Sequence, residues 1–282
     1  MPAAIETIDF HGQPALRLAT ASGAQAVVLL LGAQVVSWTP PGGPERLYLS
    51  ERAAFDGSAA VRGGVPVCFP QFAARGPLPR HGFVRTMPWS VETQRTGTDF
   101  ALATLRCTDT EATRALWPHR FALELTVAIE ESRLDLELEV VNEDDAPFSF
   151  TAALHTYLKV REVEETRIEG LYGLDYEDST DAGRLHHDSG DVLLIESETD
   201  RIYREVARPL LVREYDRSLG INQEGFHDVV VWNPWEERCA ALADMPDRGF
   251  RHMLCVEAAA VHAPIELEAG LNWWGRQTLV AL

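Results

Sequence analysis

Apolar side chains recur at every second residue through the middle of this sequence, and that period restricts the fold more than any other feature. The first run comprises Leu123, Leu125, Val127 and Ile129, and the second comprises Leu134, Leu136, Leu138 and Val140. Between the two runs lies the polar segment Glu131-Ser132-Arg133. Because a strand points successive side chains to opposite faces, these runs predict a long antiparallel hairpin with one buried face.

The alternation resumes after the polar turn at Asn142 to Asp145. The apolar positions there are Phe148, Phe150, Ala152, Leu154 and Leu158. This pattern predicts a third strand that extends the hairpin into a meander. Further strands are expected at Ala26 to Ser37, Phe100 to Arg106, Val192 to Ile195, Leu210 to Glu214, His227 to Trp232 and Met253 to Glu257.

Helical periodicity is scarce in this chain. We expect one short helix over Asp244 to Arg251, where Pro246 lies near the N-terminal end. Many short strands separated by loops favour an all-β sandwich or barrel. The sequence contains neither a Ser/Gly-rich linker nor an internal repeat, so we expect a single domain covering residues 1–282.

The charge of the chain limits its partners. With 25 Lys plus Arg against 43 Asp plus Glu, the formal net charge is -18. This field opposes an extended surface for nucleic acid or anionic lipid, so neither partner is expected. Lys159 is the only lysine, and the other basic residues are arginines, whose forked guanidinium groups suit carboxylate or phosphate. A small anionic ligand therefore remains compatible with the composition.

The sequence shows no membrane or export signal. Its apolar stretches fall far short of the roughly 20 residues that a membrane-spanning helix needs, and no basic segment precedes an apolar run at the N-terminus. A cytoplasmic location and reduced, buried cysteines are therefore expected. Neither the widely spaced cysteines nor His186-His187 shows the spacing of a metal site, so no metal is expected.

His155 is the first candidate for chemistry. Even-numbered positions form the apolar face of the predicted strand Phe148 to Val160, so His155 projects from the other face together with Tyr157. One interpretation is a hydrogen-bonded surface histidine. The other is a general acid that works near neutral pH.

Glu257 is the second candidate because it stands in an apolar segment. It follows Met253 to Val256 and precedes Ala258 to Val261. Burial of a carboxylate without a partner is costly and raises its pKa, which suits a base that accepts a proton from a weakly acidic hydroxyl. The alternative is a solvated glutamate at the end of a strand. If His155 and Glu257 meet, they could move protons at opposite ends of one small molecule.

Three arginines, Arg62, Arg80 and Arg85, lie in segments too rich in glycine and proline to be plain strands. In a strongly acidic chain they indicate a local anion site, although bridges from loops to acidic neighbours are the alternative. Asp200 adds a carboxylate whose ordinary interpretation is solvated surface charge. The glycine-rich loops that cradle nucleotide phosphates are absent from the sequence.

Taken in order, several segments of the chain resemble the hexose-6-phosphate mutarotases (glucose-6-phosphate 1-epimerases) of the aldose 1-epimerase superfamily. These segments are Arg62 to Pro70, His81 to Arg85, Ala153 to Tyr157, Asp200 to Tyr203, Val231 to Trp235 and Cys255 to Glu257. The resemblance runs from about Ala26 to Gln277. It implies a galactose-mutarotase-like β-supersandwich and an isomerase that needs no metal or organic cofactor.

The resemblance also implies roles for individual residues. By motif, His155 and Glu257 are similar to the catalytic acid and base of the family, and Arg62, Arg85 and Asp200 to residues that hold the phosphosugar. The position of Arg80 also lines the ligand, although relatives often carry an uncharged residue there. The stretch Gln71 to Leu78 departs from the family's aromatic-glycine pattern, and His81 ranks below the arginines as a supporting residue.

The implied reaction interconverts the α and β anomers of a D-hexose 6-phosphate, with glucose 6-phosphate as the expected substrate and a monomer as the expected state. Three alternatives stay open. A mutarotase of non-phosphorylated aldoses would share the acid and base but would not need convergent arginines. A glycosidase would need a second carboxylate to match Glu257. A non-catalytic carbohydrate-binding protein would share the fold without the chemistry.

Overall fold

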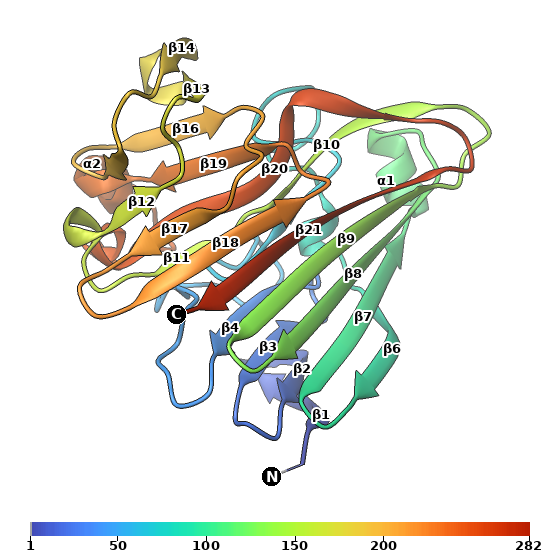
Figure 1. Ribbon diagram of the computed structural model, residues 1–282. Helices are drawn as coiled ribbons and strands as arrows, with labels where there is room; N and C mark the ends of the chain where they lie inside the picture. The colour runs from blue at the N-terminus through green and yellow to red at the C-terminus, as the bar shows by residue number, and fades with distance from the viewer. Residues whose placement is uncertain (1) are drawn as a thin grey trace.

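The computed structural model describes residues 2–282, which form mainly antiparallel strands in three sheets (Figure 1). A four-stranded sheet has the order β1 (Ala4–Phe10), β2 (Gln13–Ala19), β3 (Gln25–Leu29) and β4 (Val35–Thr39). A nine-stranded sheet has the order β15 (Val192–Leu194), β12 (Arg167–Glu169), β17 (Leu210–Arg213), β18 (Ser218–Glu224), β21 (Asn272–Ala281), β9 (Arg133–Asn142), β8 (Phe121–Glu130), β7 (Phe100–Thr108) and β6 (Ser90–Thr96).

An eight-stranded sheet completes the architecture. Its order is β14 (Arg184–His187), β13 (Asp175–Asp178), β16 (Thr199–Tyr203), β19 (Asp228–Asn233), β20 (Met253–Leu267), β10 (Phe148–Leu154) and β5 (Val67–Cys68), and β11 (Tyr157–Lys159) also pairs with β20. The helical elements are short: α1 (Glu111–Leu116), α2 (Trp235–Ala240), and the 3-10 turns η1 (Val84–Thr86), η2 (Val163–Glu165), η3 (Ser179–Asp181) and η4 (Gly249–His252). Among residues 2–282, no helix is long and apolar enough to cross a membrane.

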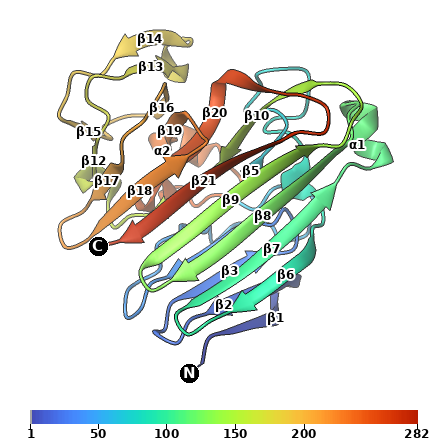
Figure 2. The same ribbon diagram turned by 45° about the vertical axis from the view of Figure 1, so that its right-hand side comes forward.

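The two larger sheets lie one against the other (Figure 2), and their side chains share one apolar core. Leu125 of β8 and Leu138 of β9 contribute from the nine-stranded sheet, and Leu154 of β10 and Val256 of β20 contribute from the eight-stranded sheet. All four side chains are completely buried. The molecule is therefore a β-sandwich, and the predicted all-β fold class is confirmed.

The hairpin predicted from the alternating pattern is confirmed. Strands β8 and β9 pair antiparallel, with Leu125 opposite Leu138, and the odd-numbered side chains of β8 face the core. The meander is wrong, because β9 pairs with β21 on its other side and β10 belongs to the other large sheet. The polar turn after Asn142 carries the chain from one sheet to the other, a crossing that alternation alone cannot reveal.

Three other predictions need correction. The stretch Ala26 to Ser37 is two strands, because Gly32 and Ala33 take positive φ values of 70° and 47° and turn the chain back on itself. The helix expected over Asp244 to Arg251 is only the 3-10 turn Gly249–His252, and the α-helix lies earlier, at Trp235–Ala240. The strand expected to end at Glu257 continues to Leu267.

Strand β20 pairs with three other strands in the part of the eight-stranded sheet that holds Glu257. It pairs with β10 where Leu154 faces Ala258, and with β11 where Tyr157 faces Cys255. On its other side it pairs with β19, where Val230 faces Glu257. Glu257 therefore lies well inside a central strand, with neighbours on both sides.

Candidate active site

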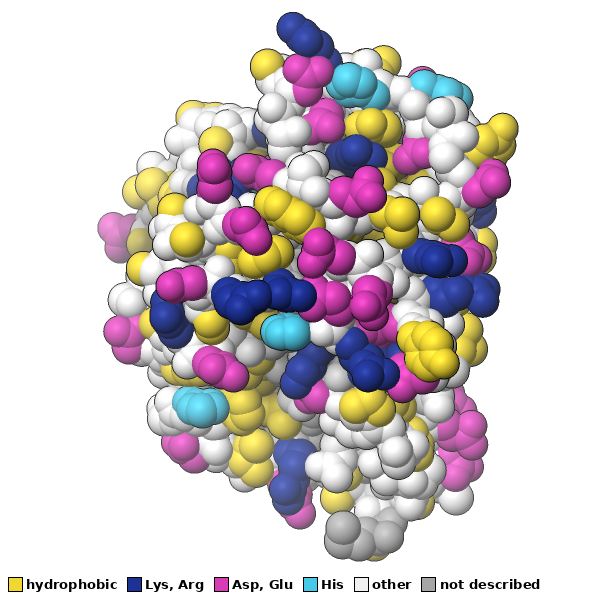
Figure 3. All heavy atoms as spheres, turned by 90° about the vertical axis from the view of Figure 1, so that its left-hand side faces the viewer, with side chains coloured by type: hydrophobic (Ala, Val, Ile, Leu, Met, Phe, Trp, Pro, Cys, Tyr) yellow, Lys and Arg dark blue, Asp and Glu magenta, His cyan; other side chains and the backbone are white. Residues whose placement is uncertain are grey.

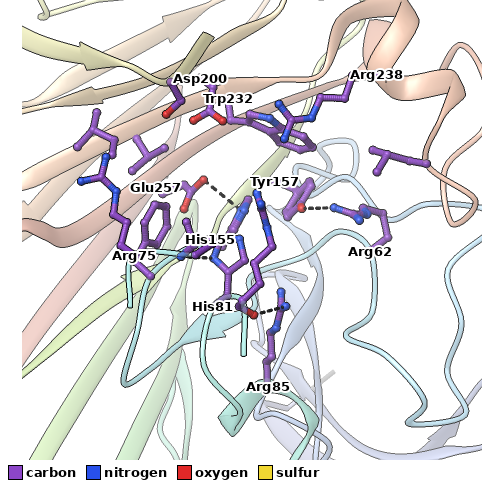
Figure 4. Close-up of a pocket in the computed structure, with 18 residues that line it drawn as sticks. Arg62, Arg75, His81, Arg85, His155, Tyr157, Asp200, Trp232, Arg238 and Glu257 are labelled. Atoms are coloured by element: carbon purple, nitrogen blue, oxygen red, sulfur yellow. Dashed lines mark hydrogen bonds and ion pairs between the residues drawn. The ribbon is translucent and has the colours of Figure 1, made fainter. Parts of the chain in front are cut away.

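A cavity of about 640 Å³ opens beside β20 (Figure 4). All the residues that the sequence analysis selected line it: Arg62, Arg80, Arg85, His155, Asp200 and Glu257. The wall also contains His81, which the sequence analysis ranked as a supporting residue, and residues that the prediction did not include, among them Arg75, Tyr157, Trp232 and Arg238. The fold thus brings together side chains from segments that are far apart in the sequence.

His155 lies in the interruption between β10 and β11, where its backbone N–H donates to the carbonyl of Pro66 at 2.9 Å. Its ring stacks on Tyr157 with centroids 4.8 Å apart and an interplanar angle of 10°. The rings of Trp232 and His81 pack against the same imidazole, with centroid distances of 6.1 and 5.3 Å. Only 7% of His155 is exposed, so the interpretation as a surface histidine is wrong.

Glu257 is 1% exposed, which also overturns the interpretation as a solvated strand end. Its Oε1 lies 3.2 Å from Nδ1 of His155, and Figure 4 shows the two side chains directed toward each other. Within residues 2–282, neither Glu257 Oε2 nor His155 Nδ1 has a partner of hydrogen-bond geometry. Buried polar atoms without such partners are rare in folded proteins, so these two mark the pair as a candidate for chemistry.

Burial shifts both groups in the directions that favour proton exchange. It raises the pKa of Glu257 well above its ordinary value, and the nearby carboxylate of Asp200 adds to the rise. It lowers the pKa of His155 well below the usual value for histidine, with further lowering from His81 and Arg62. A carboxylate becomes a stronger base and an imidazolium a stronger acid under these shifts.

Arg62 is held rigidly at the wall. Its Nε donates to Asp244 at 3.1 Å, and its Nη1 donates to the hydroxyl of Tyr157 at 3.0 Å. Burial acts to lower the pKa of Arg62, but Tyr157 and Asp244 outweigh it and the net shift is upward. Because Tyr157 also stacks on His155, one chain of contacts links Arg62 to the imidazole.

Arg80 and Arg85 differ from the other cavity arginines because, within residues 2–282, neither has a carboxylate at ion-pair distance. Arg85 donates through Nη2 to the backbone carbonyl of Arg80 at 2.8 Å. Arg75 pairs with Glu177, and Arg238 with Glu198 at 2.5 Å. Acidic side chains are spread over the face shown in Figure 3, and among the arginines that line the cavity only these two lack such a partner in the described residues.

His81 lies between Arg80 and Arg85 in the sequence, and its ring is held by neighbouring groups. Its Nδ1 accepts from the backbone N–H of Ala73 at 3.4 Å and lies 3.3 Å from the thiol of Cys68. Burial lowers its pKa to about 3, with Arg85 and Arg80 acting in the same direction. His81 is therefore neutral near pH 7, and the contact with Ala73 leaves its proton on Nε2.

The glycine after His81 is required by sterics. Gly82 has a φ of 70°, and a Cβ there would lie 1.8 Å from the carbonyl oxygen of Phe69. Only glycine permits this approach of the two backbones. It fixes the loop that carries His81 and its flanking arginines.

Asp200 lies in β16, opposite Trp232 in β19, and its carboxylate reaches the cavity. Burial raises the pKa of Asp200, and the charge of Arg238 acts against that rise. Trp232 was left out of the predicted site, yet its side chain forms part of the cavity wall. Its place opposite Asp200 follows from strand pairing, which no local motif reveals.

One group of side chains in the site has ligands suited to a metal ion. The ligand atoms of His155, Cys255 and Glu257 lie within 4.8 Å of one another. Three arginines, Arg62, Arg80 and Arg85, line the same cavity and repel cations. We therefore assign no metal to this group.

Comparison with known proteins identifies relatives along nearly the whole chain. The family model for aldose 1-epimerase matches residues 14–279. A protein of Cenchrus ciliaris, provisionally named a glucose-6-phosphate 1-epimerase, is 37% identical over 267 residues, which are 91% of this chain and 81% of the relative. A protein of Escherichia coli K12 with the same provisional name is 32% identical over 239 residues, covering 83% of this chain and 79% of the relative.

Solved structures agree with these sequence matches. A provisionally named mutarotase from Salmonella typhimurium superimposes with a TM-score of 0.91 at 27% identity, covering 100% of this chain and 96% of that one. A galactose 1-epimerase from Lactobacillus acidophilus gives a TM-score of 0.77 at 13% identity, covering 100% of this chain and 99% of that one. The second comparison concerns the fold alone.

Proposed function

The chain belongs to the aldose 1-epimerase family, and we propose that it interconverts the α and β anomers of a D-hexose 6-phosphate without a cofactor, with glucose 6-phosphate as the substrate. The observation that carries the proposal is the approach of His155 to Glu257 in a cavity that also holds Arg80 and Arg85 without carboxylate partners. The provisional names of the curated relatives support the same substrate.

The proposed reaction proceeds from the form of the His155–Glu257 pair in which the imidazole carries the pair's single proton, whereas the opposed pKa shifts favour the form with that proton on Glu257. Glu257 accepts the proton of the anomeric O1 hydroxyl while His155 donates its proton to the ring oxygen O5, and the C1–O5 bond breaks. The sugar opens to an aldehyde, and rotation about C1–C2 presents the other carbonyl face. O5 then attacks C1 again, and both proton transfers reverse to give the other anomer.

The geometry of the pair suits this sequence of steps. O1 and O5 are bonded to the same carbon atom, so the groups that serve them must lie within a few ångströms of each other. The 3.2 Å between His155 Nδ1 and Glu257 Oε1 meets that requirement. From the form with the proton on His155, the raised pKa of Glu257 favours its uptake of the O1 proton, and the lowered pKa of His155 favours donation of its proton to O5.

The phosphate is assigned to Arg80 and Arg85, with Arg62 contributing from its fixed place beside Tyr157. Charge-assisted hydrogen bonds from guanidinium groups are strong, and they hold one end of the substrate while the ring is open. Asp200 would accept hydrogen bonds from sugar hydroxyls, and Trp232 offers an aromatic face beside it. His81, neutral and protonated on Nε2, would donate a hydrogen bond rather than add charge.

A comparison of substrates tests the proposal. Freshly dissolved α-glucose 6-phosphate and α-glucose are followed by polarimetry with and without the protein, and inorganic phosphate is added as a competitor. We expect acceleration that is far greater for the phosphosugar and that phosphate suppresses. Equal acceleration of both sugars, unaffected by phosphate, would instead identify a mutarotase of free aldoses.

A further inference from the structure

Gln277 occupies a position where the pattern of its strand calls for an apolar residue. The inward-facing residues of β21 are Trp273, Gly275, Gln277 and Leu279. Gln277 is 1% exposed and lies between the two large sheets. A side-chain amide in such a place costs free energy unless both its donor and its acceptor are paired.

Both ends of this amide bind the backbone region that carries the His155–Glu257 pair. Gln277 Nε2 donates to the carbonyl of Val256 at 3.0 Å, and Thr156 Oγ1 donates to Gln277 Oε1 at 2.5 Å. Val256 N–H in turn donates to the carbonyl of Thr156 at 3.1 Å. These three bonds close a ring through the residues that directly follow His155 and directly precede Glu257.

The ring lies where the sheet is otherwise irregular. Strand β10 ends at Leu154 and β11 begins at Tyr157, so His155 and Thr156 fall in a gap between two regular pairings with β20. The N–H of Thr156 bonds to the carbonyl of Leu154 in its own segment instead of to β20. Without a cross-link the gap could widen, and the separation of the two side chains would change with it.

We propose that Gln277 is a positioning residue that sets the separation and orientation of His155 and Glu257 by cross-linking Thr156 to Val256 from the opposite sheet. This inference rests on the proposed function of the pair. Gln277 does not line the cavity, so it acts through the backbone and not on the sugar. Misplacement of reacting groups by about 1 Å can lower turnover about 100-fold, so a small displacement is enough to matter.

The chain offers a matched control in Asn142. Its side chain is also a completely buried amide, and its Nδ2 donates to the carbonyl of Leu267 at 2.8 Å, at the opposite end of β20 from Glu257. Gln277→Met and Asn142→Leu therefore each remove an amide bond to the same strand. Only the first removes it beside the site.

We expect Gln277→Met to lower kcat on glucose 6-phosphate by about 10- to 100-fold with little change in KM. We expect Asn142→Leu to lose stability on urea denaturation while keeping the wild-type kcat. Thr156→Val should lower kcat as well, and Thr156→Ser, which keeps the hydroxyl, should recover most of that loss. Equal effects of Gln277→Met and Asn142→Leu on kcat would overturn the proposal.

A second readout separates this inference from the proposed function. Imidazole 15N shifts of His155 are recorded against pH in the wild type, Gln277→Met and Asn142→Leu. We expect them to change in Gln277→Met alone. Identical shifts in all three proteins would contradict the positioning role. Failure of the wild type to act on glucose 6-phosphate with these shift changes present would contradict the substrate and leave the positioning role supported.

Discussion

His155 Nδ1 lies 3.2 Å from Glu257 Oε1 because the two residues stand opposite each other on neighbouring antiparallel segments. Leu154 faces Ala258 and Tyr157 faces Cys255, and the same register carried across the gap places His155 opposite Glu257. Pairing across a sheet thus produces an acid and base from residues that are distant in the sequence. The surrounding burial then shifts the two pKa values in opposite directions.

Glu257→Gln should lower kcat by about 10² to 10⁴, because the amide cannot accept the proton of the O1 hydroxyl. The measurement is the anomerisation rate of glucose 6-phosphate after subtraction of the spontaneous rate. Glu266→Gln, which changes an exposed glutamate on the same strand, is the matched control and should retain full activity. Parental turnover in Glu257→Gln would show that another group serves as the base.

Arg85→Gln should raise KM for glucose 6-phosphate by about 10- to 100-fold, since a hydrogen bond to a charged group contributes about 1.5 to 3 kcal/mol. The activity on free glucose should change little. Arg80→Gln should act in the same direction, and Arg95→Gln, on an exposed part of β6, serves as the control. An equal rise in KM for glucose and glucose 6-phosphate would argue against a phosphate contact.

The free energy of unfolding should depend on pH through His81. Burial lowers the pKa of His81 to about 3, whereas imidazole ordinarily titrates at 6.5. Between these values the unfolded chain binds more protons than the folded one, so stability rises with pH and is lost as pH falls from 6.5 toward 3. Stability is lost in this pH range because the pKa of His81 is lower in the folded protein than in the unfolded chain.

His81→Asn should make this part of the profile less steep, measured by urea denaturation at a series of pH values, while the lowered pKa of His155 leaves part of the slope in place. Asparagine does not titrate there and tolerates the φ of 63° found at this position. His262→Asn, at an exposed residue of β20, should leave the slope as it is. A slope in His81→Asn as steep as in the wild type would refute the assignment.

Gly82→Ala should destabilise the protein more than Gly12→Ala. Both glycines have positive φ, at 70° and 82°, so alanine costs about 1 to 2 kcal/mol at either position. Only at Gly82 does the new Cβ meet the backbone, 1.8 Å from the oxygen of Phe69, whereas nothing lies within 4 Å at Gly12. Overpacking should add about 1 to 3 kcal/mol, measured by denaturant unfolding. Equal losses in the two variants would contradict the close approach.

The alternation of apolar and polar residues was enough to predict strands that have one buried face. The hairpin of β8 and β9 follows directly from Leu125, Leu138 and their neighbours, because each strand has one apolar face. The partners of a strand are not encoded in that pattern, and for this reason the third strand was assigned to the wrong sheet. Strand β21 was missed because Gly275 and Gln277 interrupt its apolar row.

Cavity residues could be predicted where a polar side chain departs from the local pattern of the sequence. Glu257 interrupts an apolar run, and His155 lies on the face opposite the apolar one. Both residues line the cavity. Arg75 and Arg238 carry no comparable signal, because arginine is ordinary in a loop and on a short helix. Their positions at the cavity depend on how loops and strands meet in three dimensions.

The most direct test of the account is the exchange between the two anomers of glucose 6-phosphate at equilibrium. The C1 signals of both anomers are followed by NMR exchange spectroscopy as wild-type protein is added. We predict an exchange rate that increases in proportion to protein concentration, with no net consumption of the sugar. A phosphorus signal that shifts on binding while the exchange rate stays at its spontaneous value would contradict catalysis and identify a binding protein instead.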